Sequence, residues 1–289
     1  MSYPIIAANR EVGSVETLCR ALGVSVSGYY AWRSRPPSQR EQADAVLLKA
    51  IQTAYQAGRS LYGSPRIHAI LRQQGLCGSR KRVARLMRQH GIHSRRRPKR
   101  RVRTTDSRHN RPVAPNLLKR DFSANAANEK WLGDIVGIWT DKGWLYLAAL
   151  LDTYSRFIVG WAMSVYRDEV LGEAALWMAL VRRDLPQPAD LIQHTDRGSQ
   201  YTADDYLALL KAHGIQVSMS NKGDPYDNAM MESFFSTLRA ELTDLERFAT
   251  RQAARTAVFE FIEVFYNRQR LHSSLGYRSP LAFETDHFS

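Results

Sequence analysis

Residues 131–139 read Trp131-Leu-Gly-Asp-Ile-Val-Gly-Ile-Trp139. This run is rich in β-branched and aromatic residues, which is typical of a buried strand. It nevertheless contains one carboxylate, Asp134. A carboxylate at an apolar strand position is costly to desolvate unless a positive group pairs with it, and no Lys or Arg adjoins Asp134 in the sequence. The run therefore predicts a core strand that carries a functional acid.

Asp196 lies at a comparable position. It closes Leu191-Ile-Gln-His-Thr-Asp196, a short apolar run that predicts a strand stopped by Arg197-Gly198-Ser199. His194 lies two residues before Asp196 and shares its strand face, so it is either a neighbour of a metal site or a hydrogen-bonded structural histidine. The run places a second carboxylate at the end of a core strand.

Glu232 occurs in a helical setting. The segment reads Asp227-Asn-Ala-Met-Met-Glu-Ser-Phe-Phe-Ser-Thr-Leu-Arg239, and its apolar residues recur at helical spacing. Asn228, Glu232 and Arg239 fall together on another face of this helix. Alone, three acids among 28 are more simply interpreted as surface residues and a helix cap. If they converge, their hard oxygen ligands suit Mg²⁺ or Mn²⁺, and two such ions are a recurring device for phosphodiester chemistry.

The order of several phrases around these acids favours convergence. They are Gly143-Trp-Leu-Tyr-Leu-Ala148, Tyr154-Ser-Arg-Phe-Ile-Val-Gly-Trp161, His194-Thr-Asp-Arg-Gly-Ser-Gln-Tyr201, Asp227-Asn-Ala-Met-Met-Glu-Ser-Phe-Phe235, Tyr266-Asn-Arg-Gln-Arg-Leu-His272 and Leu275-Gly-Tyr-Arg-Ser-Pro280. In addition, 35 residues separate Asp196 from Glu232, and Arg239 follows the glutamate by seven positions. This ordered set resembles the DDE core of transposases and retroviral-type integrases. It most closely resembles bacterial transposases of the insertion sequence three family, over residues 58–284.

The resemblance implies a site and a reaction. Asp134, Asp196 and Glu232 would be the catalytic residues and the ligands of Mg²⁺, with Mn²⁺ as an alternative. The reaction would be metal-dependent nicking at the ends of an insertion sequence, followed by strand transfer, which integrates and recombines DNA. A DNA-binding regulator with a non-catalytic core and a structure-specific nuclease are the alternatives.

The resemblance also implies partners. These are DNA, as element ends and as target, and a further copy of the chain, because joining two ends argues for at least a dimer. Family members often arise by frameshifted fusion of two reading frames. The chain resembles the second-frame product, so an upstream-frame protein is a further candidate partner.

The elements expected over residues 129–245 are three strands, a helix, a strand, a helix, a strand and a helix. This order predicts an α/β, ribonuclease-H-like catalytic core, a mixed sheet with helices on both faces and the acids at one end. Asp152 is expected in a turn. The loop at residues 221–227 lies over DNA in the resembled cores, so Tyr226, Asn228 and Arg239 are candidate DNA contacts, with ordinary surface polarity as the alternative. Residues 246–289 are expected to pack on the core as a helical extension.

Charge divides the chain into two halves. Residues 1–120 contain 25 Lys and Arg against 5 Asp and Glu, a net charge of +20, whereas residues 121–289 have a net charge of −7. A basic front half indicates polyanion binding, and an acidic, carboxylate-bearing back half suggests metal chemistry.

The front half is expected to be helical. Ser14 and Ser25 are candidate caps of two short helices in residues 1–38, a helix-turn-helix-like segment for which DNA contact and an ordinary helical hairpin both remain open. Residues 41–94 predict a second helix-turn-helix module, with Ser64 as a further cap and Pro65 at the first helical position.

Basic residues are densest at the end of this second module. Its last helix carries cations on its outer face, and the scarcity of nearby acids favours DNA contact over a solvated face. The linker at 95–128 opens with Arg95-Arg-Arg-Pro-Lys-Arg-Arg-Val-Arg103, seven cations in nine residues, whose binding to phosphate would be driven by counterion release. The candidate DNA contacts are Arg80, Lys81, Arg82, Arg85, Arg88, Arg95, Arg96, Arg97, Lys99, Arg100 and Arg101.

Cysteine usage and hydropathy bear on location. Cys19 and Cys77 fit no zinc or disulfide spacing, which predicts buried free thiols in a reducing compartment. The sequence has no apolar run long enough to cross a bilayer and no signal-peptide pattern. These features predict a bacterial cytoplasmic protein with access to the chromosome and no membrane partner.

Overall fold

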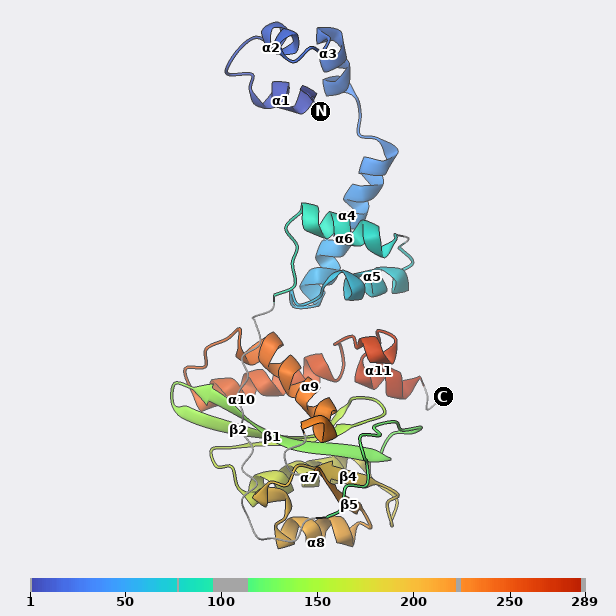
Figure 1. Ribbon diagram of the computed structural model, residues 1–289, viewed down its shortest axis with the longest axis vertical. Helices are drawn as coiled ribbons and strands as arrows, with labels where there is room; N and C mark the ends of the chain where they lie inside the picture. The colour runs from blue at the N-terminus through green and yellow to red at the C-terminus, as the bar shows by residue number, and fades with distance from the viewer. Residues whose placement is uncertain (1, 77, 96–113, 222–224, 287–289) are drawn as a thin grey trace.

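The computed structural model describes residues 2–76, 78–95, 114–221 and 225–286. The described residues form three tiers along the long axis of the molecule (Figure 1). Helices α1–α3 lie at one end, α4–α6 lie in the middle, and a sheet with helices on both faces lies at the other end. None of the described helices is both long enough and apolar enough to span a membrane.

The first tier is a small bundle of three helices. The Ser14 and Ser25 side chains each accept a hydrogen bond from the backbone N–H three residues further on, so both predicted caps are confirmed. Ile6, Cys19 and Tyr29 form its core, each at most 1% exposed, and Cys19 is a buried free thiol. The helices are α1 Ser2–Ala8, α2 Val15–Ala21 and α3 Val26–Ser34.

The second tier contains α4 Gln39–Ala57, α5 Ser64–Gln73 and α6 Arg80–Gln89. The prediction that Ser64 caps α5 was wrong by one residue. Gly63 occupies the N-cap without a side-chain bond, and Ser64 and Pro65 already belong to the first turn. A proline is well placed there because its missing N–H would have no intrahelical partner.

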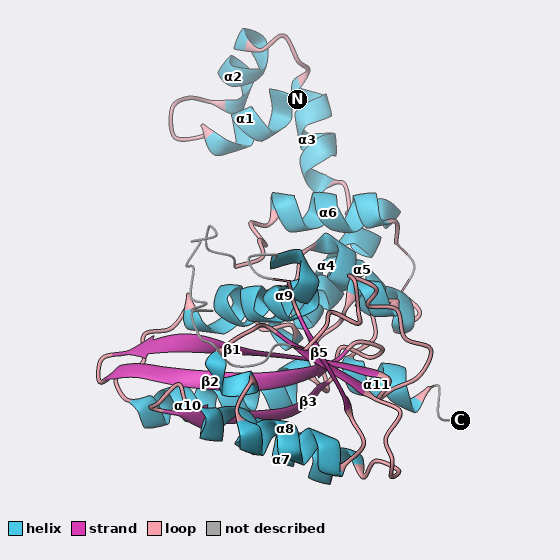
Figure 2. Ribbon diagram, turned by 60° about the horizontal axis from the view of Figure 1, so that its bottom comes forward, coloured by secondary structure: helices cyan, strands magenta, loops and turns pink. Residues whose placement is uncertain are grey.

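The third tier is built on a five-stranded mixed sheet with the order β3-β2-β1-β4-β5. The central strand β1 pairs antiparallel with β2 and parallel with β4, and β5 is parallel to β4. Figure 2 shows the strands crossing the tier between two layers of helices. The predicted ribonuclease-H-like α/β architecture is therefore confirmed. The elements are β1 Lys130–Thr140, β2 Gly143–Asp152, β3 Ile158–Ser164, α7 Glu169–Arg183, β4 Ile192–Thr195, η1 Ser199–Tyr201, α8 Asp204–Ala212, β5 Gln216–Met219, η2 Pro225–Asn228 and α9 Ala229–Leu238.

Strand β1 separates two apolar cores because its side chains alternate between the faces of the sheet. Trp131 and Ile135 pack in the core beneath α7 and α8, whereas Leu132 and Val136 pack in the core that contains α9 and α10. Asp134 has the parity of Leu132 and Val136, so β1 directs it to the face that α9 covers.

The C-terminal part covers this same face of the sheet (Figure 1). In the expected helical extension, α10 Arg251–Phe259 continues directly as the π-helix η4 Glu260–Tyr266. Helix α9 likewise passes into the π-helix η3. The remaining elements are η3 Arg239–Thr243, η5 Ser273–Leu275 and α11 Pro280–Thr285.

The second and third tiers are joined by polar contacts and by a shared apolar core. The Tyr62 hydroxyl accepts a hydrogen bond from the backbone N–H of Leu271 at 3.0 Å, and Arg66 Nε donates to the Leu271 carbonyl at 2.9 Å. Arg59 forms an ion pair of 2.7 Å with Glu260. Apolar residues of α4–α6 and of α9 and α10 belong to one continuous cluster. The basic helices thus rest directly on the C-terminal extension.

Candidate active site

The three predicted acids lie on three neighbouring elements. Asp134 is in β1, Asp196 directly follows β4, and Glu232 is one turn into α9. In the parallel register of β1 and β4, Gly133 is opposite Thr195. The residues that follow these two are Asp134 and Asp196. Asp134 and Asp196 are half-buried, while Glu232 is exposed at the surface of the helix.

The electrostatics of Asp134 reflect its neighbours. Burial raises the pKa of the Asp134 carboxyl to about 8, and the negative charges of Asp196 and, more weakly, Glu232 add to this rise. The backbone N–H of Ile135, which donates to Oδ1 at 2.7 Å, and the positive charge of Arg167 oppose it.

Arg167 is a site residue that the sequence did not predict. The expectation that Asp134 has no cationic partner holds for adjacent residues only, because the fold brings in Arg167 from the turn between β3 and α7. Nothing in the local phrase Tyr166-Arg-Asp168 marks this residue, since its role depends on a contact made across the sheet.

The carboxylates of Asp134, Asp196 and Glu232 suit a divalent cation, although they are not arranged as a complete metal site. Within the described ranges, no three His, Cys, Asp or Glu side chains are grouped closely enough to form a metal site. The carboxylate oxygens are nevertheless hard ligands of the kind that Mg²⁺ and Mn²⁺ take. Burial, and after it the repulsion from Asp196, raises the pKa of Asp134, and a bound cation would favour the charged carboxylate against both effects. The residues therefore fit such an ion by chemistry.

Local hydrogen bonds explain the phrase around Asp196. Its Oδ1 accepts a hydrogen bond from the backbone N–H of Gly198 at 3.0 Å, which turns the chain immediately after β4. Arg197 Nε donates to the Ser220 carbonyl at 2.6 Å and ties this turn to the end of β5. This turn holds Asp196 at the C-terminal end of β4.

Asn228 does not lie on the exposed face where a DNA contact was expected. Its side chain is 6% exposed, and its Nδ2 donates to the carbonyl of Gly133 at 3.2 Å. The expectation extrapolated the helical wheel of α9 to a residue that belongs to the 3₁₀ turn η2, which directs the amide inward. Asn228 therefore contacts the backbone next to Asp134.

Two other candidate contacts remain accessible. Tyr226 is 68% exposed, and the Arg120 guanidinium lies 5.6 Å from the centre of its ring. Arg239 is half-buried and follows Glu232 by two helical turns on nearly the same face. Tyr226 lies six residues before Glu232, and Arg239 lies seven residues after it.

His194 and Asp152 both have structural hydrogen-bonding roles. The two ring nitrogens of His194 lie 2.8 Å from Ser218 Oγ and 3.0 Å from Ser220 Oγ, and burial lowers the pKa of the imidazole to about 4. The buried Asp152 carboxylate accepts hydrogen bonds from the backbone N–H groups of Asn128 and Tyr154. Asp152 therefore holds the turn after β2, as expected.

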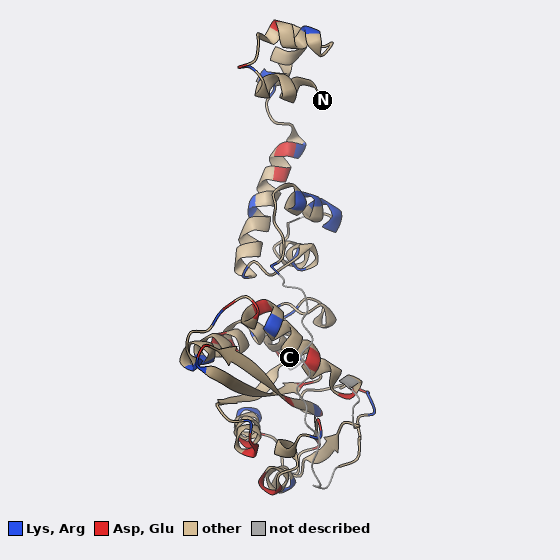
Figure 3. Ribbon diagram, turned by 60° about the vertical axis from the view of Figure 1, so that its left-hand side comes forward, with Lys and Arg blue, Asp and Glu red and all other residues tan. Residues whose placement is uncertain are grey.

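The cations of α6 divide into two groups. Arg82 and Arg85 each form an ion pair of 2.6 Å with Asp44, which links α6 to α4. Arg80, Lys81 and Arg88 are exposed, and in the ribbon of Figure 3 the Lys and Arg positions of this helix are blue in the middle tier. Arg95 is also exposed. The other candidate contacts lie outside the described residues: Arg96, Arg97, Lys99, Arg100 and Arg101.

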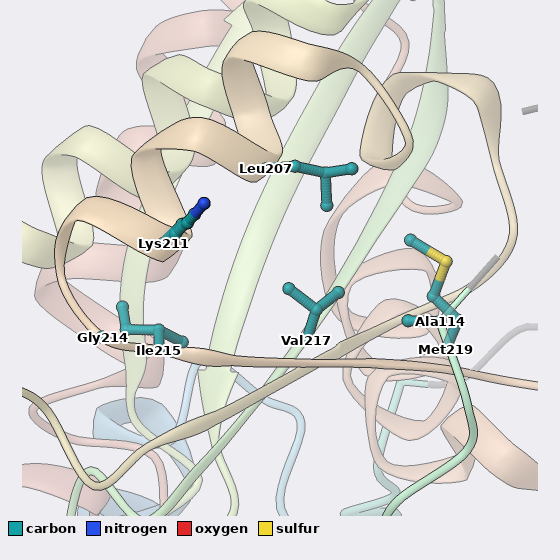
Figure 4. A pocket seen from close by; sticks show the side chains of 7 residues that line it. All are labelled: Ala114, Leu207, Lys211, Gly214, Ile215, Val217 and Met219. Atoms are coloured by element: carbon teal, nitrogen blue, oxygen red, sulfur yellow. The ribbon is translucent and has the colours of Figure 1, made fainter. Parts of the chain in front are cut away.

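A surface hollow elsewhere on the sheet does not contain these acids. It has a volume of about 520 Å³ and lies between α8 and the edge strand β5 (Figure 4). Its lining is mainly apolar, with Lys211 as its charged side chain. The candidate active site is thus separate from it, on the face of the sheet that carries α9.

A mixed sheet with acids on β1, after β4 and on α9, preceded by a helical front part, is the arrangement of an integrase-type catalytic core. Family models agree with this class. Two models described as "Integrase core domain" match residues 124–225 and 213–280, and one described as "HTH-like domain" matches residues 41–100.

Full-length relatives identify the family. The chain is 45% identical over 266 residues to the insertion element IS600 uncharacterized 31 kDa protein of Shigella sonnei, covering 92% of this chain and 97% of that protein. It is 42% identical over 291 residues to transposase InsF for insertion sequence IS3A of Escherichia coli (strain K12), covering 98% of each. The chain belongs to the family of IS3 transposases. The predicted family and the predicted function, DNA transposition by an integrase-core enzyme, are confirmed at this level.

Solved structures include a more distant likeness. In the cryoEM structure of the simian T-cell lymphotropic virus intasome in complex with PP2A regulatory subunit B56 gamma, one chain is 14% identical, with a TM-score of 0.47. The match covers 75% of this chain and 73% of that chain.

Proposed function

We propose that this transposase nicks DNA at the ends of its insertion sequence and then transfers the freed strand, using divalent metal ions held by Asp134, Asp196 and Glu232. The observation that carries the proposal is geometric: β1 and β4 are adjacent, Gly133 lies opposite Thr195 in their register, and Asp134 and Asp196 are the residues that follow. Glu232 lies on α9, the helix on the face to which β1 directs Asp134. Mg²⁺ is the expected ion and Mn²⁺ the alternative, because the donors are carboxylate oxygens.

Each acid contributes differently to this site. When bound, the ions would supply Lewis-acid activation of water and stabilisation of the leaving oxygen. Asp134 must release the proton that its raised pKa retains, and the Ile135 N–H fixes the orientation of its carboxylate. The positive charge of Arg167 offsets part of the negative charge that acts on Asp134. Glu232, on the exposed side of α9, lies where a DNA backbone can approach.

The rest of the chain is proposed to bind DNA and to support the core. Residues 1–38 and 41–94 would contact DNA, with Arg80, Lys81 and Arg88 as exposed phosphate ligands, and the linker at 95–128 would add nonspecific affinity. Tyr226 and Arg239 would contact DNA beside Glu232. Residues 129–245 would form the catalytic core and 246–289 its supporting extension.

The assembly that performs the reaction is proposed to contain at least two copies of the chain, because two element ends must be joined. A protein encoded by an upstream frame is a further proposed partner. The protein is proposed to act on chromosomal DNA in a bacterial cytoplasm, because its substrate is DNA.

Amide substitutions test the proposal. Asp134→Asn and Glu232→Gln preserve shape but remove a charged ligand, so Mg²⁺-dependent nicking of DNA that carries the element ends should fall by about 10³-fold or more. Glu246→Gln is the control, because this exposed acid lies beyond η3. Undiminished nicking by either active-site variant would refute the assignment. A strand-transfer assay on the same DNA separates a transposase, which joins the ends, from a nuclease, which only cuts.

A further inference from the structure

The N-terminus of α9 is attached to the sheet immediately beside Asp134. The Nδ2 of Asn228, the last residue before α9, donates a hydrogen bond of 3.2 Å to the carbonyl of Gly133. Gly133 directly precedes Asp134 on β1, and Glu232 lies one helical turn after Asn228. A single side chain therefore links the backbones that carry two of the three acids.

The preceding residue, Asp227, connects the start of α9 to other parts of the chain. Asp227 is 2% exposed, and its Oδ2 accepts hydrogen bonds from Asn116 Nδ2 at 2.9 Å and from the backbone N–H of Asn221 at 2.8 Å. Its Oδ1 lies 3.5 Å from Arg120 Nε. These contacts connect the start of α9 to the end of the linker, through Asn116 and Arg120, and to the loop after β5, through Asn221.

The pair is costly to bury, which argues against a purely space-filling role. The Oδ1 of Asn228 is buried and makes no hydrogen bond to any described residue. A buried acceptor without a partner is unfavourable, and an apolar side chain would avoid that penalty. Met231 and Phe234 already pack α9 against the sheet through apolar contacts. The main effect of the Asn228 amide is therefore to orient the start of α9.

We infer that Asp227 and Asn228 are positioning residues that set the separation between Glu232 and Asp134, and thereby the affinity of the site for divalent ions. The inference rests on the proposed function. Carboxylates that are fixed by neighbouring hydrogen bonds bind metal more tightly than mobile ones, and loss of such a neighbour typically weakens metal binding by about 10- to 100-fold. A helix start released from β1 would let Glu232 move away from Asp134.

The chain offers a matched control for Asn228. Asn267 is 0% exposed and also pins a helix to a strand, since its Oδ1 accepts a hydrogen bond from the backbone N–H of Ile158 at 2.9 Å and its Nδ2 donates to the carbonyl of the same residue at 3.2 Å. That strand is β3, at the opposite edge of the sheet from β5 and remote from the acids. Asn267→Ala therefore removes a comparable buried amide without touching the site.

The test is a Mn²⁺ titration of the full chain, followed by the metal-induced rise in melting temperature and, separately, by single-turnover nicking. Asn228→Ala should raise the Mn²⁺ concentration at half-effect by about tenfold in both readouts. Asn267→Ala should lower the melting temperature of the metal-free protein and leave that concentration unchanged. An Asn228→Ala protein with the wild-type midpoint, or an equal shift in Asn267→Ala, would overturn the inference.

A second variant covers the case in which Asn228→Ala does not fold. Asp227→Asn is isosteric, keeps an acceptor for Asn116 and loses the charge that faces Arg120, so its midpoint should rise by a smaller factor of about three. An unchanged midpoint would again contradict the inference. Failure of the proposed function looks different, because the wild-type chain itself would then show neither a metal-induced rise in melting temperature nor metal-dependent nicking.

Discussion

At the scale of single residues, the sequence identified the acids but not their surroundings. Asp134 could be recognised because a carboxylate in an apolar strand is anomalous wherever the strand lies. Arg167 could not, because its effect on the Asp134 pKa depends on a turn that approaches from another part of the sheet. Asn228 was assigned to the wrong surface for a related reason: its orientation is set by a turn whose geometry the helical pattern does not encode.

The raised pKa of Asp134 predicts how stability depends on pH. An unfolded aspartate has a pKa of about 3.9, whereas burial raises that of folded Asp134 to about 8. Between about pH 4 and pH 8 the folded state therefore binds a proton that the unfolded state lacks, and the metal-free protein should lose stability as the pH rises through this window.

The measurement is the melting temperature between pH 5 and pH 8 in the presence of a chelator. Asp134→Asn should remove most of the decline. The lowered pKa of His194 acts in the opposite direction, since it favours folding as the pH rises from about 4 to about 6.5, but it is common to both proteins. Parallel pH profiles for the wild type and the variant would show that Asp134 is not the residue responsible.

At the scale of elements, apolar periodicity predicted most of the core. The third strand, β3 Ile158–Ser164, and the helix after it, α7 Glu169–Arg183, follow one another in the predicted order. Both elements are set by local patterns of burial. The π-helices η3 and η4 were not predicted, because the spacing of apolar residues does not distinguish a π-helix from the α-helix that it continues.

Helix α6 illustrates the same limit for charges, and it supports a prediction. Its cations were treated as one face, but Asp44 in α4 engages Arg82 and Arg85. Replacing the exposed Arg80, Lys81 and Arg88 together by Ala should reduce the slope of log affinity against log salt for DNA by about 3, because each phosphate contact contributes about 0.9.

The double variant Arg82→Ala, Arg85→Ala is the control within the same helix. It should lower the melting temperature while leaving most of the salt slope in place, because these two side chains bind Asp44. Filter-binding at several salt concentrations measures the slope. An equal loss of slope in both variants would mean that the ion pairs with Asp44 open when DNA binds.

At the scale of the whole molecule, helices α4–α6 and the catalytic core pack against one another through a shared apolar core and are not separate domains on a string. The Tyr62 hydroxyl and Arg66 contact the loop around Leu271, which is joined to the core through Arg270. Arg270 is 4% exposed and makes two hydrogen bonds of 2.7 Å to Glu241, in the π-helix that continues α9. The sequence indicated separate modules from local patterns. It did not indicate this junction, because the junction joins residues about 200 positions apart.

The junction should contribute measurably to stability. Tyr62→Phe removes the acceptor for the Leu271 N–H and should lower the free energy of unfolding by about 1–3 kcal/mol in urea denaturation. Tyr55→Phe removes a hydroxyl that donates to the His93 carbonyl within the second tier, and serves as the control. If the second tier and the core unfold in two separate transitions in Tyr62→Phe but not in Tyr55→Phe, the junction couples them. A single transition for Tyr62→Phe, at the wild-type urea concentration, would contradict this role.

The central claim is that Asp134, Asp196 and Glu232 jointly hold divalent ions against DNA. Anomalous diffraction from crystals of the protein grown with Mn²⁺ and an element-end DNA tests it most directly. The account predicts manganese peaks bounded by the carboxylates of all three residues, next to a DNA phosphate. Saturating Mn²⁺ with no peak among these carboxylates, or with Glu232 directed away from an ion held elsewhere, would contradict it.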